Sequence, residues 1–256
     1  MTVHFVGAGP GAADLLTLRA VALLGAADVC LYPGTYIDAA VLSHLRPEAV
    51  AVDTQDLDLD QIVGYLADAH AEGKDAVRLA SGDPSLYSAL AEQTGRLDAM
   101  GIPWDVTPGV PAYAAAAALL GKELTVPKLT QSVVLTRTQA RSTAMPDTEA
   151  LANFAATRAT LVLHLAITRI RVIAEELVEH YGADCPVAVV ANASQPRELI
   201  LTGTLTDIAD QVEAAGLRQA AVIFVGYALD AAARDGRESY LYDATRDRTL
   251  KSRPTP

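Results

Sequence analysis

The stretch that decides the fold is FVGAGPGAADLLTL, residues 5–18, which follows a short apolar run at the start of the chain. Gly7, Gly9 and Ala12 satisfy the GxGxxG/A pattern of a turn that holds a dinucleotide pyrophosphate between a strand and a helix. Two features argue against a phosphate site. Pro10 has no N–H to donate, and the second apolar run ends at LYPG without an acid for a ribose hydroxyl. A tight glycine turn explains the pattern without any ligand.

Short apolar runs alternate with helical patterns through the first half of the chain. This alternation is typical of βαβ units and predicts an α/β protein with a mainly parallel sheet covered on both faces. The predicted strands are residues 3–7, 28–32, 49–53, 76–80 and 104–107, and the predicted helices are residues 14–25, 59–71, 85–100 and 110–120.

In the second half of the chain, predicted strands and helices no longer alternate regularly. We place a domain boundary near Gly121, because a glycine there is suited to ending the alanine-rich helix before it. The predicted domains are an N-terminal α/β domain, 1–120, a C-terminal α/β domain, 121–230, and a polar tail, 231–256. Further strands are predicted over residues 132–136, 160–165, 187–191, 198–202 and 221–226, with helices over 167–181 and 204–215.

Composition excludes several classes of protein. The net charge of −11 disfavours nucleic acid as a partner. The apolar run at residues 112–120 is far shorter than the ~20 residues that span a bilayer, and no leader is recognisable, so we expect a soluble, cytoplasmic protein without a membrane partner. Cys30 and Cys185 lie in apolar runs without CxxC spacing, which indicates buried, reduced thiols.

Searches for metal and nucleophile motifs find none. The chain has no phosphate-binding GxxxxGK[ST], no GxSxG and no HExxH, so we expect no protein-bound metal. Asp56, Asp58 and Asp60 alternate as in a calcium loop, but Gln61 stands where that loop needs glycine. These aspartates are better explained as a polar segment that leads into the next helix, with Asp60 as the predicted N-cap of that helix.

Glycine- and proline-rich turns follow two further predicted strands. Gly82, Asp83 and Pro84 come after one strand, and Gly109 to Ala112 come after the next. The carboxyl ends of parallel strands are where open α/β sheets bind ligands, and small residues there let a ligand approach the backbone.

Six segments in this order resemble the tetrapyrrole methylases, a family of enzymes that use S-adenosylmethionine to methylate corrin and sirohaem precursors. The segments cover nearly the whole chain to about residue 228. The usual GPGD of the family's opening is interrupted, because Ala12 and Ala13 separate Gly11 from Asp14, and Ala193 follows Asn192 where many relatives have glycine. The segments are VGAGPGAADLLTLRA (6–20), ASGDPSLY (80–87), TPGVPAYAAAAALLG (107–121), TLVLHLA (160–166), PVAVVANASQPRELILTGTL (186–205) and AAVIFVG (220–226).

Three other segments are most similar to the members that act on carbon 11 of precorrin-4 in cobalamin biosynthesis: LYPGTYID (31–38), DTQDLDLDQIV (53–63) and TRTQARSTAMP (136–146). The resemblance implies a homodimer, with S-adenosylmethionine bound in a cleft between two domains. The implied cofactor contacts are Pro10, Gly82, Asp83, Pro84, Tyr87, Pro111, Ala112, Leu165 and Ala193.

The chemistry needs little from side chains, because a sulfonium already activates the methyl group and an electron-rich ring carbon accepts it. We therefore expect no indispensable nucleophile; a proton can leave to the substrate, to water or to a carboxylate such as Asp83. Arg137 and Arg141 are the predicted partners of the carboxylates on an anionic tetrapyrrole, with Lys128, Arg169 and Arg197 behind them. Ordinary solvated arginines explain these residues equally well.

Three alternatives stay open at this point: another member of the family, acting on a different tetrapyrrole carbon or, more remotely, on a non-tetrapyrrole target; a nicotinamide-dependent oxidoreductase using the glycine turn; and a non-catalytic binding module. The sequence does not say whether the substrate carries cobalt.

Overall fold

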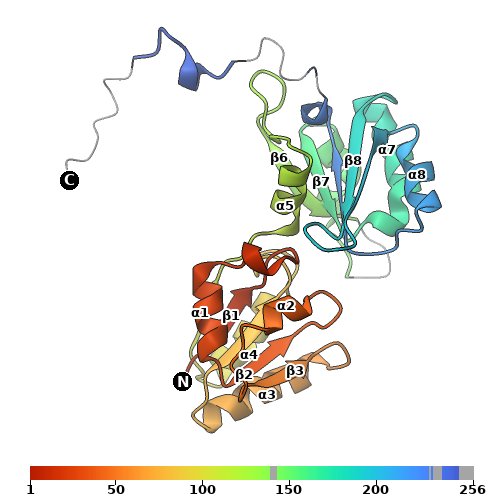
Figure 1. Ribbon diagram of the computed structural model, residues 1–256. Coiled ribbons are helices and arrows are strands. Elements are labelled where there is room, and N and C mark those ends of the chain that lie inside the picture. The colour runs from red at the N-terminus through yellow and green to blue at the C-terminus, as the bar shows by residue number, and fades with distance from the viewer. Residues whose placement is uncertain (139–142, 231, 233–237, 248–256) are drawn as a thin grey trace. The chain divides into compact units, whose positions relative to one another are not determined.

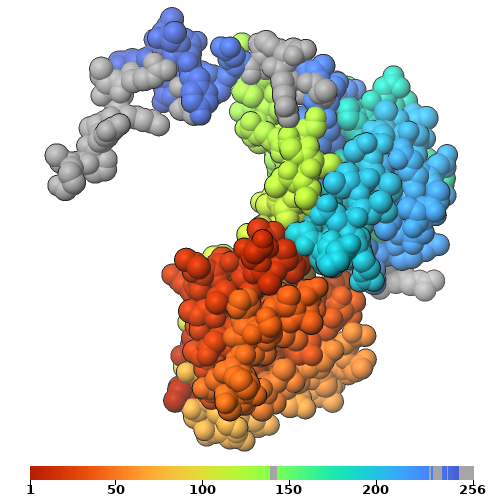
Figure 2. Space-filling model, in the orientation of Figure 1, coloured from red at the N-terminus to blue at the C-terminus, as the bar shows by residue number. Residues whose placement is uncertain are grey.

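The computed structural model describes residues 1–138, 143–230, 232 and 238–247. The chain forms two compact units. The first comprises Met1–Leu120, Val190–Ile200 and Gln219–Val222, and the second comprises the described parts of Gly121–Val189, Leu201–Arg218 and Ile223–Pro256. The red-to-orange atoms of the first unit form one closely packed body in the space-filling view (Figure 2).

The first unit contains a parallel sheet of five strands in the order β3-β2-β4-β1-β5 (Figure 1). The register pairs Gly7 with Ala80 and Val6 with Thr107, so the carboxyl ends of the three strands at this side of the sheet are level. The predicted parallel sheet is confirmed. Its strands are β1 (Val3–Gly7), β2 (Val29–Tyr32), β3 (Val50–Asp53), β4 (Ala76–Ala80) and β5 (Trp104–Thr107).

Helices cover both faces of this sheet. Ala20 and Leu24 of α1 (Leu18–Ala26) and Val41 of α2 (Ala39–Leu42) pack with the apolar residues of one face. On the other face α3 (Leu59–Ala71) and α4 (Leu90–Ala99) pack against Phe5 and Leu31. A fifth helix, α5 (Ala112–Leu119), follows β5, and Gly121 comes after its end with φ 60°, as predicted for a capping glycine.

The start of α3 corrects the sequence prediction of its N-cap. Asp58, and not Asp60, caps the helix: its carboxylate accepts a hydrogen bond from the Gln61 N–H at 2.8 Å. The Gln61 side chain in turn accepts from the Asp58 N–H at 2.9 Å. This reciprocal capping box satisfies two N–H groups at once, so the helix starts one residue after Asp58.

The second sheet has five strands in the order β6-β7-β10-β8-β9. It is mixed, because β6 pairs with β7 in parallel whereas β7 pairs with β10 antiparallel. The strands are β6 (Val133–Arg137), β7 (Thr160–His164), β8 (Pro186–Ala191), β9 (Leu199–Thr204) and β10 (Ala221–Val225), with helices α6 (Leu151–Ala155), α7 (Ile170–Tyr181) and α8 (Ile208–Ala214).

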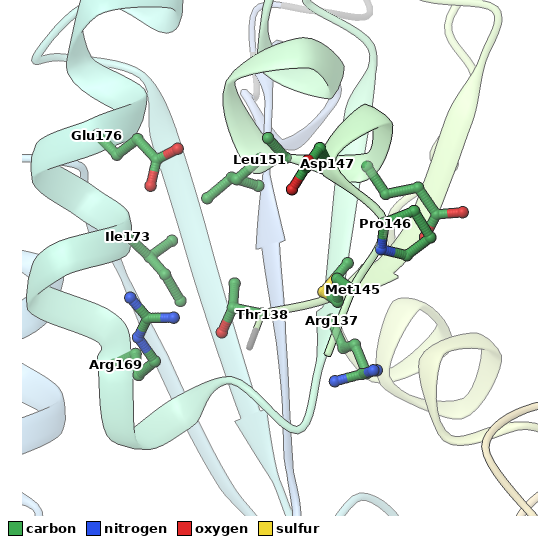
Figure 3. Close-up of a pocket in the computed structure, with 11 residues that line it drawn as sticks. Arg137, Thr138, Met145, Pro146, Asp147, Leu151, Arg169, Ile173 and Glu176 are labelled. Atoms are coloured by element: carbon green, nitrogen blue, oxygen red, sulfur yellow. The ribbon is translucent and has the colours of Figure 1, made fainter. Parts of the chain in front are cut away.

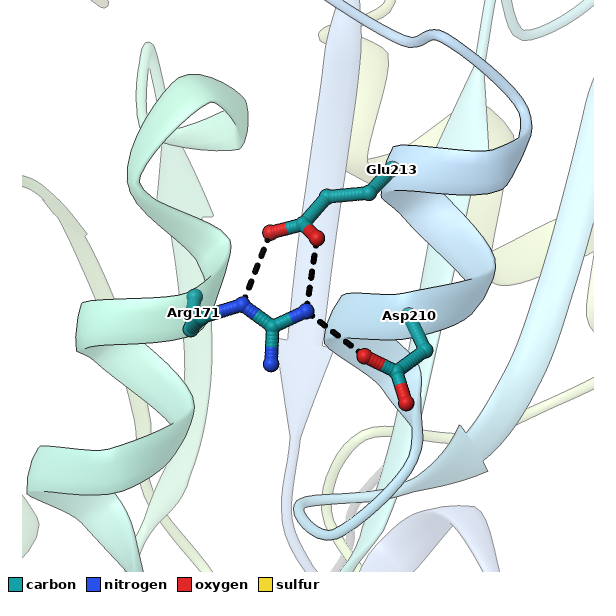
Figure 4. A network of polar contacts seen from close by, with 3 residues as sticks. All are labelled: Arg171, Asp210 and Glu213. Atoms are coloured by element: carbon teal, nitrogen blue, oxygen red, sulfur yellow. Dashed lines mark hydrogen bonds and ion pairs between the residues drawn. The ribbon is translucent and has the colours of Figure 1, made fainter.

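An exposed ion-pair network links α7 to α8 (Figure 4). The Arg171 guanidinium donates from Nε and Nη2 to both carboxylate oxygens of Glu213, at 2.9 and 2.6 Å. Nη2 also donates to Asp210 at 2.6 Å. The Arg171 guanidinium therefore faces α8 and joins the two helices on the surface of this unit.

Both cysteines are free and buried, as predicted. Burial raises the pKa of each thiol to about 12, so both are protonated at neutral pH. Among the residues that the structure describes, no helix has the length and apolar character needed to cross a membrane, and no cluster of three or more His, Cys, Asp or Glu residues is arranged to hold a metal ion.

Candidate functional site

Three glycines meet where β1, β4 and β5 end. A Cβ atom added to Gly109 would lie 2.2 Å from the Gly82 carbonyl oxygen and 2.8 Å from the Gly7 Cα. A Cβ on Gly7 would lie 2.4 Å from the Gly109 nitrogen. These distances are far below van der Waals contact, so two of the three strand exits require glycine for steric reasons. We call Gly7, Gly82 and Gly109 the glycine edge.

Asp83 connects two of these strand exits. One carboxylate oxygen accepts a hydrogen bond from the Gly109 N–H at 2.8 Å, and the other accepts from the Ser85 N–H at 2.8 Å and from the Ser85 hydroxyl. Partial burial opposes ionisation, but the hydrogen bonds from Ser85 and Gly109 outweigh it and lower the pKa of Asp83. The carboxylate is therefore ionised at neutral pH and is occupied as an acceptor.

Three N–H groups of the loop after β1 are used within the protein. Ala8 donates to the Ala80 carbonyl at 2.8 Å, Gly9 donates to the Gly82 carbonyl at 3.1 Å, and Ala12 donates to the Ser194 hydroxyl at 3.1 Å. Pro10 has no N–H, and its carbonyl accepts from the Gln195 side chain at 3.1 Å. With these groups engaged, the loop is a poor cradle for phosphate.

The first unit thus brings most of the predicted cofactor contacts together. Pro10 lies beside the segment that follows Ala193, because Gln195 bonds to it directly. Gly82 lies beside the start of α5: a Cβ on Gly82 would be 3.6 Å from the Pro111 Cα and 3.5 Å from the Ala112 nitrogen. Asp83, Pro84 and Tyr87 belong to the loop that leaves Gly82. Sequence reasoning missed Ser194 and Gln195, although both lie in a segment that carries the family resemblance.

Several non-glycine residues near the predicted contacts have left-handed backbone conformations. Tyr87 has φ 54° and a 47% exposed side chain, and Ser194 has φ 62°. In the second unit, Leu165 has φ 52° directly after β7 and is 66% exposed. Such conformations cost roughly 1–3 kcal/mol each and concentrate where proteins bind ligands. A strained and exposed leucine is hard to explain by packing alone.

The second unit contains a pocket of about 210 Å³ beside the end of β6 (Figure 3). Arg137 and Arg169 line it, and the Arg137 guanidinium also donates to the Thr143 carbonyl at 2.8 Å. The Thr138 hydroxyl is buried in its wall and has no hydrogen-bond partner among the described residues. Asp147, Glu149 and Glu176 also line the pocket, so its charge is mixed.

Two of the other predicted substrate contacts, Lys128 and Arg197, lie outside this pocket. Arg141 is outside the residues that the structure describes. Lys128 is exposed in a left-handed turn, and Arg197 is exposed in the part of the chain that belongs to the first unit. Arg137 and Arg169 are therefore the predicted cations that share a pocket.

Comparison with known families matches residues 2–209 to the Tetrapyrrole (Corrin/Porphyrin) Methylases. The chain belongs to this family. Membership confirms the family resemblance, with five of the six segments inside the matched residues. It also decides against a nicotinamide-dependent oxidoreductase, in agreement with the engaged N–H groups of the loop after β1.

Relatives match along nearly the full length. A precorrin-4 C(11)-methyltransferase of Rhodococcus erythropolis is 54% identical over 97% of this chain and 99% of its own length. A crystal structure of a cobalt precorrin-4 methyltransferase superposes with a TM-score of 0.87 at 37% identity, over 90% of this chain and 96% of the other. Uroporphyrin-III C-methyltransferase of Thermus thermophilus, solved in complex with S-adenosyl homocysteine, gives a TM-score of 0.73 at 30% identity, covering 90% of this chain and 99% of that one.

Proposed function

We propose that this protein transfers the methyl group of S-adenosylmethionine to carbon 11 of precorrin-4, a step of cobalamin biosynthesis. The full-length 54% identity to the Rhodococcus methyltransferase carries this proposal. The superposition on a cobalt precorrin-4 methyltransferase supports the same substrate class and leaves two forms of the substrate, with and without cobalt, to be compared.

The residues present suit S-adenosylmethionine. The ligand has no phosphate to neutralise; it needs close backbone contact, an apolar slot for adenine and acceptors near its sulfonium. The glycine edge leaves backbone free of side chains, and the N–H groups of Ala8, Gly9 and Ala12 are already used within the protein. The proposed contacts are Pro10, Gly82, Asp83, Pro84, Tyr87, Pro111, Ala112, Leu165 and Ala193.

When bound, the sulfonium supplies an activated methyl group. The protein's part is to hold the substrate carbon in line with it, and orientation of this kind lowers a barrier by up to ~7–11 kcal/mol. No nucleophilic side chain and no protein-bound metal enters this proposal. Asp83 is better suited to positioning than to accepting a proton, because its lowered pKa makes it a weak base and both oxygens already accept hydrogen bonds.

The substrate carries several carboxylates, whereas the protein has a net charge of −11, so cations must be concentrated locally. We assign Arg137 and Arg141 to these carboxylates. The shared pocket of Arg137 and Arg169 supports the first assignment, as does the Thr138 hydroxyl, which has no hydrogen-bond partner in the described part of the chain. His164, the register partner of Arg137 on β7, has its pKa lowered by burial and is neutral at pH 7.

Arg137→Ala is expected to raise the KM for the tetrapyrrole about tenfold or more, because a hydrogen bond to a charged group contributes about 1.5–3 kcal/mol. The affinity for S-adenosylmethionine should stay unchanged. Steady-state kinetics with calorimetry of the cofactor separates the two effects. Arg171→Ala removes an arginine of the same unit that faces α8 and should leave both values unchanged. An unaltered tetrapyrrole KM in Arg137→Ala would show that this side chain is an ordinary surface arginine.

Incubation of the purified protein with S-adenosylmethionine and a panel of precorrins, each with and without cobalt, tests the function. We expect precorrin-4 to gain one methyl group, located at carbon 11 by NMR of the product. A methyl group at another carbon would assign the chain to a different reaction of the family. Absence of transfer to every tetrapyrrole, with no heat of binding for S-adenosylmethionine, would overturn the proposal.

The family resemblance also supports a cytoplasmic homodimer with no nucleic-acid or membrane partner. Light scattering of the purified protein at several concentrations tests the oligomeric state. A constant monomer mass would contradict this part of the proposal.

A further inference from the structure

The loop between β4 and α4 carries the proposed cofactor contacts Asp83, Pro84 and Tyr87, and it has an unusual conformation. Tyr87 and Ala89 both have φ 54°, a left-handed conformation that residues with a Cβ rarely adopt. Ala89 is also the N-cap of α4, and its side chain makes no capping hydrogen bond. Hydrogen bonds within the loop, from the Leu86 N–H to the Asp83 carbonyl and from the Ser88 hydroxyl to the Pro84 carbonyl, shape its middle, whereas its end at Ala89 is held from α4.

The side chain of Gln93, in the first turn of α4, holds the end of the loop. Its Nε2 donates to the carbonyl of Ala89 at 3.1 Å and to the carbonyl of Ser88 at 3.3 Å. Ala89 is the second left-handed position itself, and Ser88 is the residue before it. Gln93 is only 4% exposed. The Ala89 carbonyl also accepts from the Gln93 backbone N–H at 3.4 Å, so loss of the side-chain amide would leave it this longer bond and would remove the bond to the Ser88 carbonyl.

Arg78 fixes Gln93 in turn. Its Nε donates to the Gln93 Oε1 at 3.1 Å, and its Nη1 donates to the carbonyl of Leu79 at 3.2 Å. Arg78 is a residue of β4, which pairs with both β1 and β2 in the interior of the sheet. Burial lowers the pKa of Arg78 to about 10, so the guanidinium stays charged at neutral pH. A charged donor orients the amide of Gln93, because Oε1 must face the arginine and Nε2 the loop.

The loop is thus held at both ends. Asp83 ties its beginning to Gly109 at the glycine edge, and the pair Arg78–Gln93 ties its end to the interior of the sheet. Tyr87, whose side chain is 47% exposed, lies between these two fixed points.

We propose that Arg78 and Gln93 are positioning residues for S-adenosylmethionine. The hydrogen bonds from Arg78 to Gln93 and from Gln93 to the loop, which we call the relay, hold residues 83–89, and Tyr87 above all, in the binding conformation. This inference rests on the proposed function of the loop. Neither residue needs to touch the cofactor. Their effect is on binding, since a loop that must be ordered at the moment of binding reduces affinity.

The test compares Gln93→Leu with Thr94→Val. Thr94 is the next residue of α4 and is 8% exposed, but its hydroxyl donates to the Leu90 carbonyl at 3.0 Å, within the helix and away from the loop. Gln93→Leu should weaken binding of S-adenosylhomocysteine, measured by calorimetry, about tenfold. At saturating S-adenosylmethionine its kcat should stay within about threefold of wild type, whereas a general loss of structure would lower kcat as well. Thr94→Val should bind as wild type does.

Hydrogen exchange of the unliganded protein gives a second measure. In Gln93→Leu the amides of residues 83–89 should exchange faster, while those of β1 should not change. If Gln93→Leu does not fold, Arg78→Lys keeps the positive charge and breaks the bond to Oε1, and the same loss of affinity is expected. The double variant Arg78→Lys, Gln93→Leu should lose no more affinity than Gln93→Leu, because both changes break one relay.

Two outcomes overturn the inference, and they are distinguishable. If wild type does not bind S-adenosylhomocysteine, the proposed function of the loop fails and the inference fails with it. If wild type binds but Gln93→Leu or Arg78→Lys binds equally well, the relay does not position the cofactor, and the proposed function is untouched.

Discussion

Gly109→Ala is expected to lower the free energy of unfolding by about 3 kcal/mol or more and to abolish binding of S-adenosylmethionine. The added Cβ would lie 2.2 Å from the Gly82 carbonyl oxygen and within 2.9 Å of two backbone atoms of Gly7. No side-chain rotation relieves these contacts, because all three atoms belong to backbone at the ends of paired strands. Either β5 separates from β1 at this end or the turn after β4 moves. Urea denaturation and calorimetry with the cofactor measure the two effects.

Gly95→Ala is the matched control. Gly95 lies inside α4, and a Cβ added there has no atom within 4 Å. Alanine in an open helical position restricts the unfolded chain, so this change should stabilise the protein by about 0.5–1 kcal/mol and leave cofactor binding unchanged. If Gly109→Ala were as stable as Gly95→Ala and bound the cofactor, the result would contradict the close contact of Gly7, Gly82 and Gly109.

Periodicity and capping signals predicted the regular elements well where local interactions decide them. Residues 59–71 form α3 as predicted, because the apolar residues recur on one face and Asp58 and Gln61 supply the cap within four residues of sequence. The boundaries of β1, β4 and β5 are also those predicted, since each is a short apolar run between turn-forming residues.

Predicted helix starts were wrong where local hydrogen bonds between side chains and the backbone compete with the first turn of the helix. The helix expected over residues 85–100 begins only at Leu90, because Asp83 binds the Ser85 N–H and Gln93 holds the carbonyls of residues 88 and 89. Similarly, the helix expected from residue 14 begins at Leu18, where Thr17 accepts a hydrogen bond from the Ala20 N–H at 3.1 Å.

The sequence predicted which residues belong to the candidate site, but not the hydrogen bonds and close contacts among them. The turn residues after each strand led us to predict that Gly82, Asp83 and Pro111 face the ligand, and this stays a prediction. The mutual contact of Gly7, Gly82 and Gly109 depends on strand order and register, which no local pattern encodes. The bond from Gln195 to Pro10 joins residues 185 positions apart, for the same reason.

Asp83→Asn is expected to reduce both stability and cofactor affinity. The carboxylate accepts from Gly109 through one oxygen and from Ser85 through the other, whereas an asparagine has a single acceptor oxygen. The NH2 group of the asparagine would face one of these N–H donors, and two donors form no hydrogen bond. Because the side chain is partly exposed, we expect a loss of about 1–2 kcal/mol in the free energy of unfolding at pH 7, smaller than for a fully buried charged hydrogen bond. Asp68→Asn, on the exposed side of α3, should change stability by less than about 0.5 kcal/mol.

The pH dependence of this loss has a definite sign. An aspartate in an unfolded chain has a pKa of about 3.9. The pKa of Asp83 is lower than this in the folded protein. Its contribution to stability is therefore complete above that value and is lost as the pH falls through the lowered folded-state pKa. Urea unfolding of wild type and Asp83→Asn at neutral pH and at several acidic values should give a difference that is constant above about pH 5 and shrinks below about pH 4. A difference independent of pH would mean that the carboxylate does not bridge the two turns in its ionised form.

Kinetics of the same variant separate positioning from proton transfer. If Asp83 positions the glycine edge, Asp83→Asn raises the concentration of S-adenosylmethionine needed for half-maximal rate and changes kcat little. If the carboxylate removes the proton from the substrate carbon, kcat falls by about 10²-fold or more at unchanged cofactor affinity. The structure favours the first result, because the oxygens that a proton would need already accept hydrogen bonds from Gly109 and Ser85.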